Sequence, residues 1–250
     1  MNTDPLHPCT KVMLAIPVYN ERETLDAVLD AVQKYPLAVV AIDDGSTDGS
    51  REILGRRRDV CAISHRKNCG YGCSLIHAFQ FAAGCGFQWV ISMDCDLQHE
   101  PARIPDFLAA IERDDADVIS GSRYLNGPNP AAVPADRYQI NQQLTHLINE
   151  VLALNLTDAF CGFKACRTAA LAKLLLTEHG YAFPLDFWVQ LAAHRLRVRE
   201  IPVELIYRDP ERTFGGHLDD PDVRLAHYRH VFDHALSRAK LVRLSDAQSA

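Results

Sequence analysis

Short runs of hydrophobic residues alternate with amphipathic segments through the first half of the chain. Continuous apolar runs are typical of buried strands, and apolar residues spaced three and four apart are typical of helices. The predicted strands are residues 12–16, 38–42, 60–64, 89–93 and 117–120. Helices are predicted between them, at residues 25–32 and 71–83. Strands that alternate with helices predict an α/β fold, with a sheet flanked by helices on both faces.

The second half of the chain is less regular. Residues 126–134 contain three prolines and a glycine, which predicts a loop. An amphipathic helix is predicted after this loop, and its apolar stripe consists of Ile140, Leu144, Leu147, Ile148 and Val151. Further predictions are strands at 160–166 and 198–207 and helices at 169–176, 187–193 and 221–244. Because no clear linker occurs, we predict one domain at residues 1–215 and a C-terminal helical extension at residues 216–250.

Composition and charge narrow the class of protein. The chain has 250 residues, 48% of them hydrophobic, which is enough for one sizeable core. A net charge of −6 does not favour a general nucleic-acid binder. The eight cysteines include no CxxC pair, so no structural zinc site is expected, and the N-terminus lacks the features of a signal peptide. We therefore expect a cytoplasmic protein with reduced thiols and no membrane-spanning segment.

Acidic residues follow two of the predicted strands. Asp94 and Asp96 lie one residue apart, and such a pair can bind Mg²⁺ or Mn²⁺ together with a phosphate. An isolated pair of this kind is more often a capped turn, so it does not decide the matter alone. Asp43 and Asp44 are open to two interpretations: a turn that begins a helix, or a carboxylate that binds a nucleoside. Ligands of parallel sheets bind at the carboxyl ends of the strands, where both pairs are expected.

Four segments, taken in order, resemble the motifs of glycosyltransferase family 2. They are residues 16–21 (Ile-Pro-Val-Tyr-Asn-Glu), 43–49 (Asp-Asp-Gly-Ser-Thr-Asp-Gly), 68–72 (Asn-Cys-Gly-Tyr-Gly) and 94–96 (Asp-Cys-Asp). Further segments are similar to those of dolichyl-phosphate mannosyltransferases and related polyprenyl-phosphate glycosyltransferases, namely residues 93–101, 121–124 and 158–164. The resemblance extends to about residue 215. It implies a GT-A fold, which is a Rossmann-like mixed sheet that binds a nucleotide sugar and is flanked by helices.

The resemblance also implies roles for individual residues. The implied ligands of the nucleotide sugar are Pro17, Tyr19, Glu21, Asp43, Asp44, Asn68, Gly70 and Asp94. Mg²⁺ or Mn²⁺ would be held by Asp94, Asp96 and Gln98. The arginines implied to contact the acceptor phosphate or the donor diphosphate are Arg123, Arg137 and Arg212. The implied catalytic residues are Asp96, Arg123, Arg212 and Asp186.

The reaction implied by the resemblance is an inverting hexose transfer. The donor would be GDP-mannose or UDP-glucose, and the acceptor a polyprenyl phosphate at the cytoplasmic face of a membrane. A cation and arginines would offset the charge on the leaving diphosphate. A phosphate acceptor is anionic at neutral pH and needs no general base, whereas a sugar hydroxyl would need one. Asp186 lies where family members with hydroxyl acceptors place their base, so polysaccharide or glycolipid synthesis is the alternative.

One departure from the subfamily bears on the acceptor. The subfamily usually has Ser-Lys after a glycine, whereas Gly216 and His217 follow Gly215 here. Loss of a lysine would weaken a phosphate contact, which leaves room for another acceptor or for a protein that binds the nucleotide without turnover. The basic stretch within residues 221–244 fits a solvated helix face better than a lipid surface. Access to a lipid acceptor would then rely on peripheral membrane contact or on a separate membrane partner protein.

Overall fold

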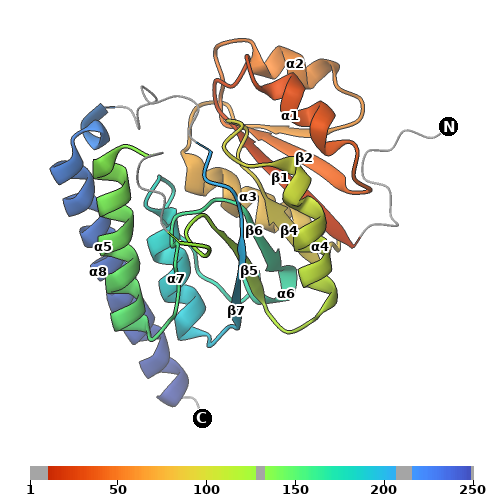
Figure 1. Ribbon diagram of the computed structural model, residues 1–250. Coiled ribbons are helices and arrows are strands. Elements are labelled where there is room, and N and C mark those ends of the chain that lie inside the picture. The colour runs from red at the N-terminus through yellow and green to blue at the C-terminus, as the bar shows by residue number, and fades with distance from the viewer. Residues whose placement is uncertain (1–10, 128–132, 207–215, 249–250) are drawn as a thin grey trace.

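The centre of the molecule is a mixed seven-stranded sheet in the order β3-β2-β1-β4-β6-β5-β7 (Figure 1). The computed structural model describes residues 11–127, 133–206 and 216–248. The strands are β1 (Val12–Val18), β2 (Ala38–Asp43), β3 (Cys61–Ser64), β4 (Trp89–Ser92), β5 (Val118–Ser122), β6 (Lys164–Arg167) and β7 (Val198–Pro202). Strand β6 is antiparallel to its neighbours β4 and β5, and the other pairs are parallel. The α/β fold with a mixed sheet is confirmed, and β7 lies at an edge as Pro202 predicts.

Helices cover both faces of the sheet. They are α1 (Leu25–Val32), α2 (Ser50–Arg56), α3 (Tyr71–Gly84), α4 (Ile104–Glu112), α5 (Ala135–Leu152), α6 (Thr168–Leu171), α7 (Phe183–Ala193) and α8 (Pro221–Gln248), with 3₁₀ turns η1 (Pro101–Arg103) and η3 (Gly216–Asp219). Successive side chains of a strand point to opposite faces. On β1, Met13 packs in the core layer that contains α3 and α7, and Leu14 packs in the layer that contains α1 and α4. Both faces of the strand are therefore buried, which explains its continuous apolar run.

An outer layer of helices lies beyond α7. Helix α7 contacts α5 and α8, and Figure 1 shows α5 and α8 side by side at one end of the molecule. Trp188 of α7 is fully buried and donates its indole N–H to the carbonyl of Ala159 at 2.8 Å. Phe232 of α8 is buried in the same core layer. Because residues 207–215 lie outside the described residues, the division of the chain at residue 215 stays a prediction.

Three predicted elements, one helix and two strands, are markedly shorter than expected. The helix predicted at 169–176 covers only Thr168–Leu171. The backbone after it is bound by side chains of α7: the N–H of Leu175 donates to Gln190, and that of Thr177 donates to Asp186. These contacts replace helical hydrogen bonds, so the helix ends early.

The strand predicted at 160–166 begins only at Lys164, because the preceding backbone folds around a buried carboxylate. The N–H of Phe160 donates to the Asp158 side chain at 3.2 Å. The strand predicted at 198–207 ends at Pro202, and the last residue of that prediction lies outside the described residues. Helix α4 was not predicted.

Several chain segments meet at the end of the sheet where most of its strands have their carboxyl ends. The carboxyl ends of β1, β2, β4 and β5 lie at this end of the sheet because these strands run parallel to one another. The N–H of Asp44 donates to the carbonyl of Val18 at 2.8 Å, which holds the first two loops together. The antiparallel β6 starts here, so the Ser92 hydroxyl reaches the carbonyl of Gly162 at 2.7 Å. The acidic loops and the segment that precedes β6 are therefore neighbours.

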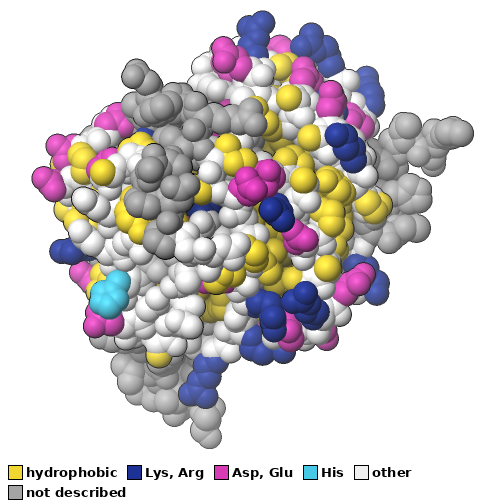
Figure 2. Space-filling view, in the orientation of Figure 1, with side chains coloured by type: hydrophobic (Ala, Val, Ile, Leu, Met, Phe, Trp, Pro, Cys, Tyr) yellow, Lys and Arg dark blue, Asp and Glu magenta, His cyan; other side chains and the backbone are white. Residues whose placement is uncertain are grey.

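We looked for a membrane span among the described helices and for a dominant charge on the face drawn in Figure 2. Among residues 11–127, 133–206 and 216–248 we find no helix with the length and hydropathy of a membrane span. On the face drawn in Figure 2, acidic and basic side chains lie close together around the edge, with hydrophobic side chains between them. This face therefore lacks the strong basic field typical of nucleic-acid binding.

Candidate active site

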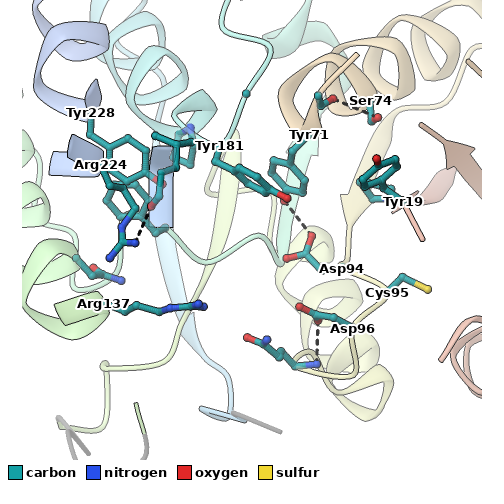
Figure 3. A pocket seen from close by; sticks show the side chains of 18 of the residues that line it. Tyr19, Tyr71, Ser74, Asp94, Cys95, Asp96, Arg137, Tyr181, Arg224 and Tyr228 are labelled. Atoms are coloured by element: carbon teal, nitrogen blue, oxygen red, sulfur yellow. Dashed lines mark hydrogen bonds between the residues drawn. The ribbon is translucent and has the colours of Figure 1, made fainter. Parts of the chain in front are cut away.

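A cavity of about 630 Å³ opens beside the carboxyl ends of the parallel strands. Many of the residues predicted to form the site line it, namely Pro17, Tyr19, Glu21, Asp44, Asn68, Gly70, Asp94, Asp96, Gln98, Arg123 and Arg137. Figure 3 shows Asp94 and Asp96 on one side of the cavity, with Arg137 and Arg224 opposite them. The fold thus brings together an acidic wall from the sheet and a basic wall from the outer helices.

Asp94 and Asp96 follow β4 and both reach the cavity. The Tyr71 hydroxyl donates to Asp94 Oδ1 at 2.9 Å, and the Gln98 backbone N–H donates to Asp96 Oδ1 at 3.0 Å (Figure 3). Cys95, between them, is 2% exposed and packs in the core layer of α1 and α4. This alternation places two carboxylates on the cavity wall and the thiol in the core.

The side chains around Asp94 fix its position. At Gly162 a Cβ atom would lie 2.5 Å from Asp94 Oδ2 and 2.7 Å from the Tyr71 hydroxyl, so only glycine fits. The N–H of Asp94 donates to His99 Nδ1 at 2.9 Å. Burial lowers the pKa of His99 to about 4, so the ring is neutral at neutral pH and its Nδ1 can accept this bond.

The donor set fits a hard divalent cation. Asp94 and Asp96 offer carboxylate oxygens at the cavity wall, and the Asp94 side chain is 29% exposed. The softer ligands nearby are not directed to this wall, since Cys95 is buried in the core and His99 Nδ1 accepts a backbone N–H. Mg²⁺ and Mn²⁺ bind in this manner, through few protein carboxylates and the oxygens of a substrate phosphate.

Asp44 is held rigidly beside the cavity. Its Oδ1 accepts the Cys69 N–H at 2.8 Å and lies 2.6 Å from His65 Nδ1, and its Oδ2 accepts the Gly70 N–H at 2.8 Å. Gly70 has a φ of +103°, and a Cβ there would lie 2.3 Å from the carbonyl oxygen of His179. A glycine is therefore required where the loop passes Asp44.

The structure does not bring Asp43 to the cavity wall. Its side chain is fully buried, with Oδ1 accepting the Ser46 N–H at 2.8 Å and Oδ2 accepting Arg51 Nε–H at 2.6 Å. Burial alone would raise the pKa of Asp43, but the hydrogen bonds from Ser46 and Arg51 lower it below its usual value. The charged Asp43 therefore ties the loop to α2.

A further polar contact joins the first two motifs. Asn20 accepts the N–H of Thr47 through Oδ1 at 2.8 Å, and its own N–H donates to Ser46 Oγ at 3.0 Å. Asn20 adopts the left-handed backbone conformation, with φ of 56°. The neighbouring Tyr19 remains 43% exposed and presents its ring at the cavity.

Comparison with known proteins identifies the family. The sequence profile of Glycosyl transferase family 2 matches residues 13–175. This chain belongs to glycosyl transferase family 2. The match includes the loops after β1, β2 and β4 and the segment that leads into β6, so these motifs are those of a glycosyltransferase.

Two curated relatives are similar to most of this family 2 protein. An undecaprenyl-phosphate mannosyltransferase from Micrococcus luteus is 30% identical over 210 residues, which is 80% of this chain and 85% of the relative. A polyprenol monophosphomannose synthase from Mycolicibacterium smegmatis is 26% identical over 214 residues, covering 82% of this chain and 80% of the relative.

Solved structures show the same fold at lower identity. Glucosyl-3-phosphoglycerate synthase from Mycobacterium tuberculosis, in complex with UDP, has a TM-score of 0.69 and 17% identity over 95% of this chain and 83% of that chain. The same enzyme with Mn²⁺, UDP-glucose and phosphoglyceric acid also has a TM-score of 0.69, at 18% identity over 95% of this chain and 82% of that chain. The GT-A fold of this glycosyltransferase is therefore confirmed.

Arg123, which directly follows β5, also lines the glycosyltransferase cavity. It forms a bidentate pair with the fully buried Asp158, with Nε–Oδ2 at 2.6 Å and Nη2–Oδ1 at 2.9 Å. Burial alone would raise the pKa of Asp158, but Arg123 and Asn141 lower it well below its usual range. The pair uses two of the five N–H donors of the guanidinium, which is held rigidly at the cavity wall.

Other arginines reach the cavity from the outer helices. Arg137 of α5 extends into it, on the side opposite Asp96 (Figure 3). Arg224 of α8 also lines the cavity and donates to the carbonyl of Leu218 at 2.9 Å and to Asp136 at 2.6 Å. Arg224 is buried and thus joins α8 to α5 beside the cavity.

One predicted catalytic residue is not brought to the cavity wall, and another cannot be compared with the structure. Arg212 lies outside the described residues. Asp186, in the first turn of α7, is 1% exposed, accepts the N–H groups of Thr177 and Glu178 at 2.8 and 3.1 Å, and forms an ion pair with Arg238 of α8. Its contacts are those of a buried structural carboxylate.

Sequence analysis missed several residues that line or support the site. They are Tyr71, Asp158, Tyr181, Arg224, His227 and Tyr228. The rings of Tyr71 and Tyr181 are stacked with centroids 6.1 Å apart (Figure 3). Tyr71 and Asp158 fall inside segments that carry the family resemblance, which gave a usable signal. The other four lie outside those segments, so only the fold reveals them.

Proposed function

We propose that this protein transfers a hexose, with inversion, from a nucleoside-diphosphate sugar to a polyprenyl phosphate. The observation that carries the proposal is a single cavity in which Asp94 and Asp96 face a wall of arginines. The relatives from Micrococcus luteus and Mycolicibacterium smegmatis are named for mannose transfer to polyprenyl phosphates, which supports the same reaction class here.

The donor would occupy the part of the cavity formed by the first three motifs. The exposed ring of Tyr19 offers a face for a nucleobase, and the fixed Asp44 carboxylate offers acceptors for the N–H or hydroxyl groups of the nucleoside. The proposed ligands are Pro17, Tyr19, Glu21, Asp44, Asn68 and Gly70. GDP-mannose and UDP-glucose both fit this general chemistry.

Asp94 and Asp96, assisted by Gln98, would hold Mn²⁺ or Mg²⁺ against the diphosphate. When bound, the cation supplies Lewis-acid stabilisation of the negative charge that develops on the leaving nucleoside diphosphate. The Tyr71 hydroxyl, which donates to Asp94, keeps that carboxylate directed into the cavity.

The acceptor phosphate would bind on the arginine side. Arg123, Arg137 and Arg224 line the cavity and would supply bidentate donors for phosphate oxygens. Arg212, which lies outside the described residues, is proposed as a further donor. A phosphate acceptor is anionic at neutral pH, so it can attack the anomeric carbon without a general base. The burial of Asp186 in an ion pair with Arg238 supports an acceptor of this kind.

A lipid acceptor requires access to a membrane surface. We propose peripheral contact with the cytoplasmic face of the membrane, either directly or through a membrane partner protein. Co-sedimentation of the purified protein with vesicles, with and without polyprenyl phosphate in the bilayer, tests direct contact. Binding only when the lipid is present would favour contact through the acceptor itself.

Transfer of radiolabelled sugar to a short-chain polyprenyl phosphate tests the reaction. We expect a labelled sugar-phospholipid from either GDP-mannose or UDP-glucose in the presence of Mn²⁺ or Mg²⁺, and none after chelation with EDTA. The Asp96→Ala variant should lower the rate by about a hundredfold or more, since it removes a metal ligand. Transfer that is unaffected by EDTA and by this substitution would contradict the proposed metal site.

A further inference from the structure

Four side chains with metal-ligating atoms converge next to Asp44. The ligand atoms of His65, Cys69 and Cys73 all lie within 4.8 Å of one another. His77 Nδ1 lies 2.8 Å from His65 Nε2 and 3.9 Å from Cys73 Sγ. These four residues do not line the cavity, so the cluster is separate from Asp94 and Asp96.

The local fold explains the convergence. Cys73 and His77 are four residues apart on α3, so they share one face of the helix. Cys69 immediately precedes Gly70, the residue before the first turn of that helix, and His65 immediately follows β3. The residues recur every four positions without a CxxC pair, and this explains why the sequence pattern did not indicate a metal site.

His65 is oriented as metal-bound histidines are. Its Nδ1 lies 2.6 Å from Asp44 Oδ1, so the carboxylate accepts the Nδ1–H and leaves Nε2 as the acceptor nitrogen. That nitrogen is directed to the cluster, where it shares a hydrogen bond with His77. A carboxylate that fixes the tautomer of a ligating histidine is a common second layer of zinc sites.

We propose that His65, Cys69, Cys73 and His77 form a Zn²⁺ site that fastens the loop between β3 and α3 to the helix. Two thiolates and two imidazoles are the tetrahedral donor set that favours zinc over harder cations. Zn²⁺ uptake displaces the thiol protons of Cys69 and Cys73 into solvent. The proton that His77 Nδ1 donates to His65 Nε2 moves to the other ring nitrogen of His77, so both imidazoles bind the ion in their neutral form. Two thiolates neutralise the charge of the ion.

Burial at the cluster suits a metal that enters from solvent. His65 is 9% exposed and Cys73 6% exposed, so they form the inner side. Cys69 is half-buried and His77 is exposed, so the outer side is open to an entering ion. Zinc uptake does not depend on the proposed sugar transfer, because its ligands are separate from the cavity. Only an effect of zinc on nucleotide binding, through Asp44, would rest on the proposed function.

Metal analysis of the purified full chain under reducing conditions tests this site. After incubation with Zn²⁺ and dialysis, we expect about one zinc per chain by mass spectrometry. With Co²⁺ in its place, the charge-transfer and visible absorption of thiolate-bound tetrahedral cobalt should appear. Loss of a residue that only supports a metal ligand commonly weakens metal binding ~10–100-fold, and loss of a ligand itself should weaken it at least as much. We therefore expect Cys73→Ser to weaken zinc binding by about 100-fold or more and His77→Ala by at least about tenfold.

Matched controls separate this site from other thiols and imidazoles. Cys85 and His146 are exposed and lie outside the cluster, so Cys85→Ser and His146→Ala should bind zinc as the wild type does. Because His77 is exposed, His77→Ala should fold even if Cys73→Ser does not. The proposal is overturned if the reduced chain takes up no zinc, if cobalt gives no thiolate absorption, or if His77→Ala retains wild-type affinity. A Cys69–Cys73 disulfide that resists the reducing agent and so prevents zinc uptake would overturn the proposal as well.

Discussion

At the scale of single residues, the cavity depends on side chains that position other side chains. Tyr71 and Gly162 fix Asp94, one by a hydrogen bond and the other by leaving room for it. Asp158 likewise fixes Arg123, another residue that lines the cavity. Errors of about 1 Å in such positions can lower an enzymatic rate about a hundredfold, so these supporting residues should matter for activity.

Replacement of Gly162 by alanine tests this dependence. The new Cβ would lie 2.5 Å from Asp94 Oδ2, so the carboxylate must move, and we expect sugar transfer to fall by about a hundredfold. Gly84→Ala is the matched control, because a Cβ there meets nothing within 4 Å in α3. It should keep full activity and raise the free energy of unfolding by about 0.5–1 kcal/mol. Wild-type kinetics in Gly162→Ala would show that Asp94 needs no fixed position.

Asp158→Asn tests the buried ion pair. Removing one charge leaves Arg123 unpaired, so the free energy of unfolding at pH 7, measured with urea, should fall by about 3 kcal/mol or more. The pKa of Asp158 is lowered on folding. Its charge therefore stabilises the fold above about pH 4, and this contribution is lost as the pH falls below that value.

The loss of stability between pH 5 and pH 3 should accordingly be smaller in Asp158→Asn than in the wild type, because the variant lacks the carboxylate whose protonation destabilises the wild type. Asp106→Asn, at an exposed carboxylate of α4, is the control and should follow the wild-type curve closely. An Asp158→Asn variant as stable as the wild type at neutral pH would contradict the importance assigned to this pair.

At the scale of elements, apolar patterning was informative where packing is regular. Strands β1 and β2 are buried on both faces, so their uninterrupted apolar runs predicted them to within two residues. The same reasoning extended the helix at 169–176 too far, since Leu174 to Leu176 are apolar but the backbone N–H of Leu175 donates to Gln190 of α7. Tertiary hydrogen bonds of this kind leave no periodic signal in the sequence.

The site residues show the same limit. The order of the motifs located the acidic pairs, because strand ends at one edge of a parallel sheet must meet. The pattern could not decide between Asp43 and Asp44, since the direction of each side chain depends on the pleat at the end of β2. Arg224 was missed for a different reason: it joins the cavity only through the packing of α8 on α5 and α7.

The contact between α7 and α8 can be tested at Asp186. This carboxylate accepts two backbone N–H groups and pairs with Arg238, so Asp186→Asn should lower the free energy of unfolding by about 3 kcal/mol. Transfer per folded molecule should remain within about tenfold of the wild type, because a phosphate acceptor needs no base. Asp222→Asn, at an exposed position of α8, is the control. A fall in transfer beyond about a hundredfold, with folding intact, would favour a hydroxyl acceptor and Asp186 as its base.

At the scale of the whole molecule, the cavity lies where two layers with different chemistry meet. The carboxyl ends of the strands contribute Asp44, Asp94 and Asp96, and the outer helices contribute Arg137 and Arg224. One wall of the cavity is therefore locally basic although the net charge of the chain is −6. An acidic wall suits a cation and the donor diphosphate, and a basic wall suits a second anionic group, which is the central claim about the acceptor.

The most direct measurement compares two acceptors of identical chain length, a short polyprenyl phosphate and the corresponding polyprenol. Each is supplied with GDP-mannose or UDP-glucose and Mn²⁺ or Mg²⁺, and the labelled lipid product is counted. We predict transfer to the phosphate and none above background to the alcohol, because only the phosphate is an anion that the arginine wall can bind and that attacks without a base. Equal transfer to the alcohol, or transfer only to a sugar hydroxyl, would contradict the proposed acceptor.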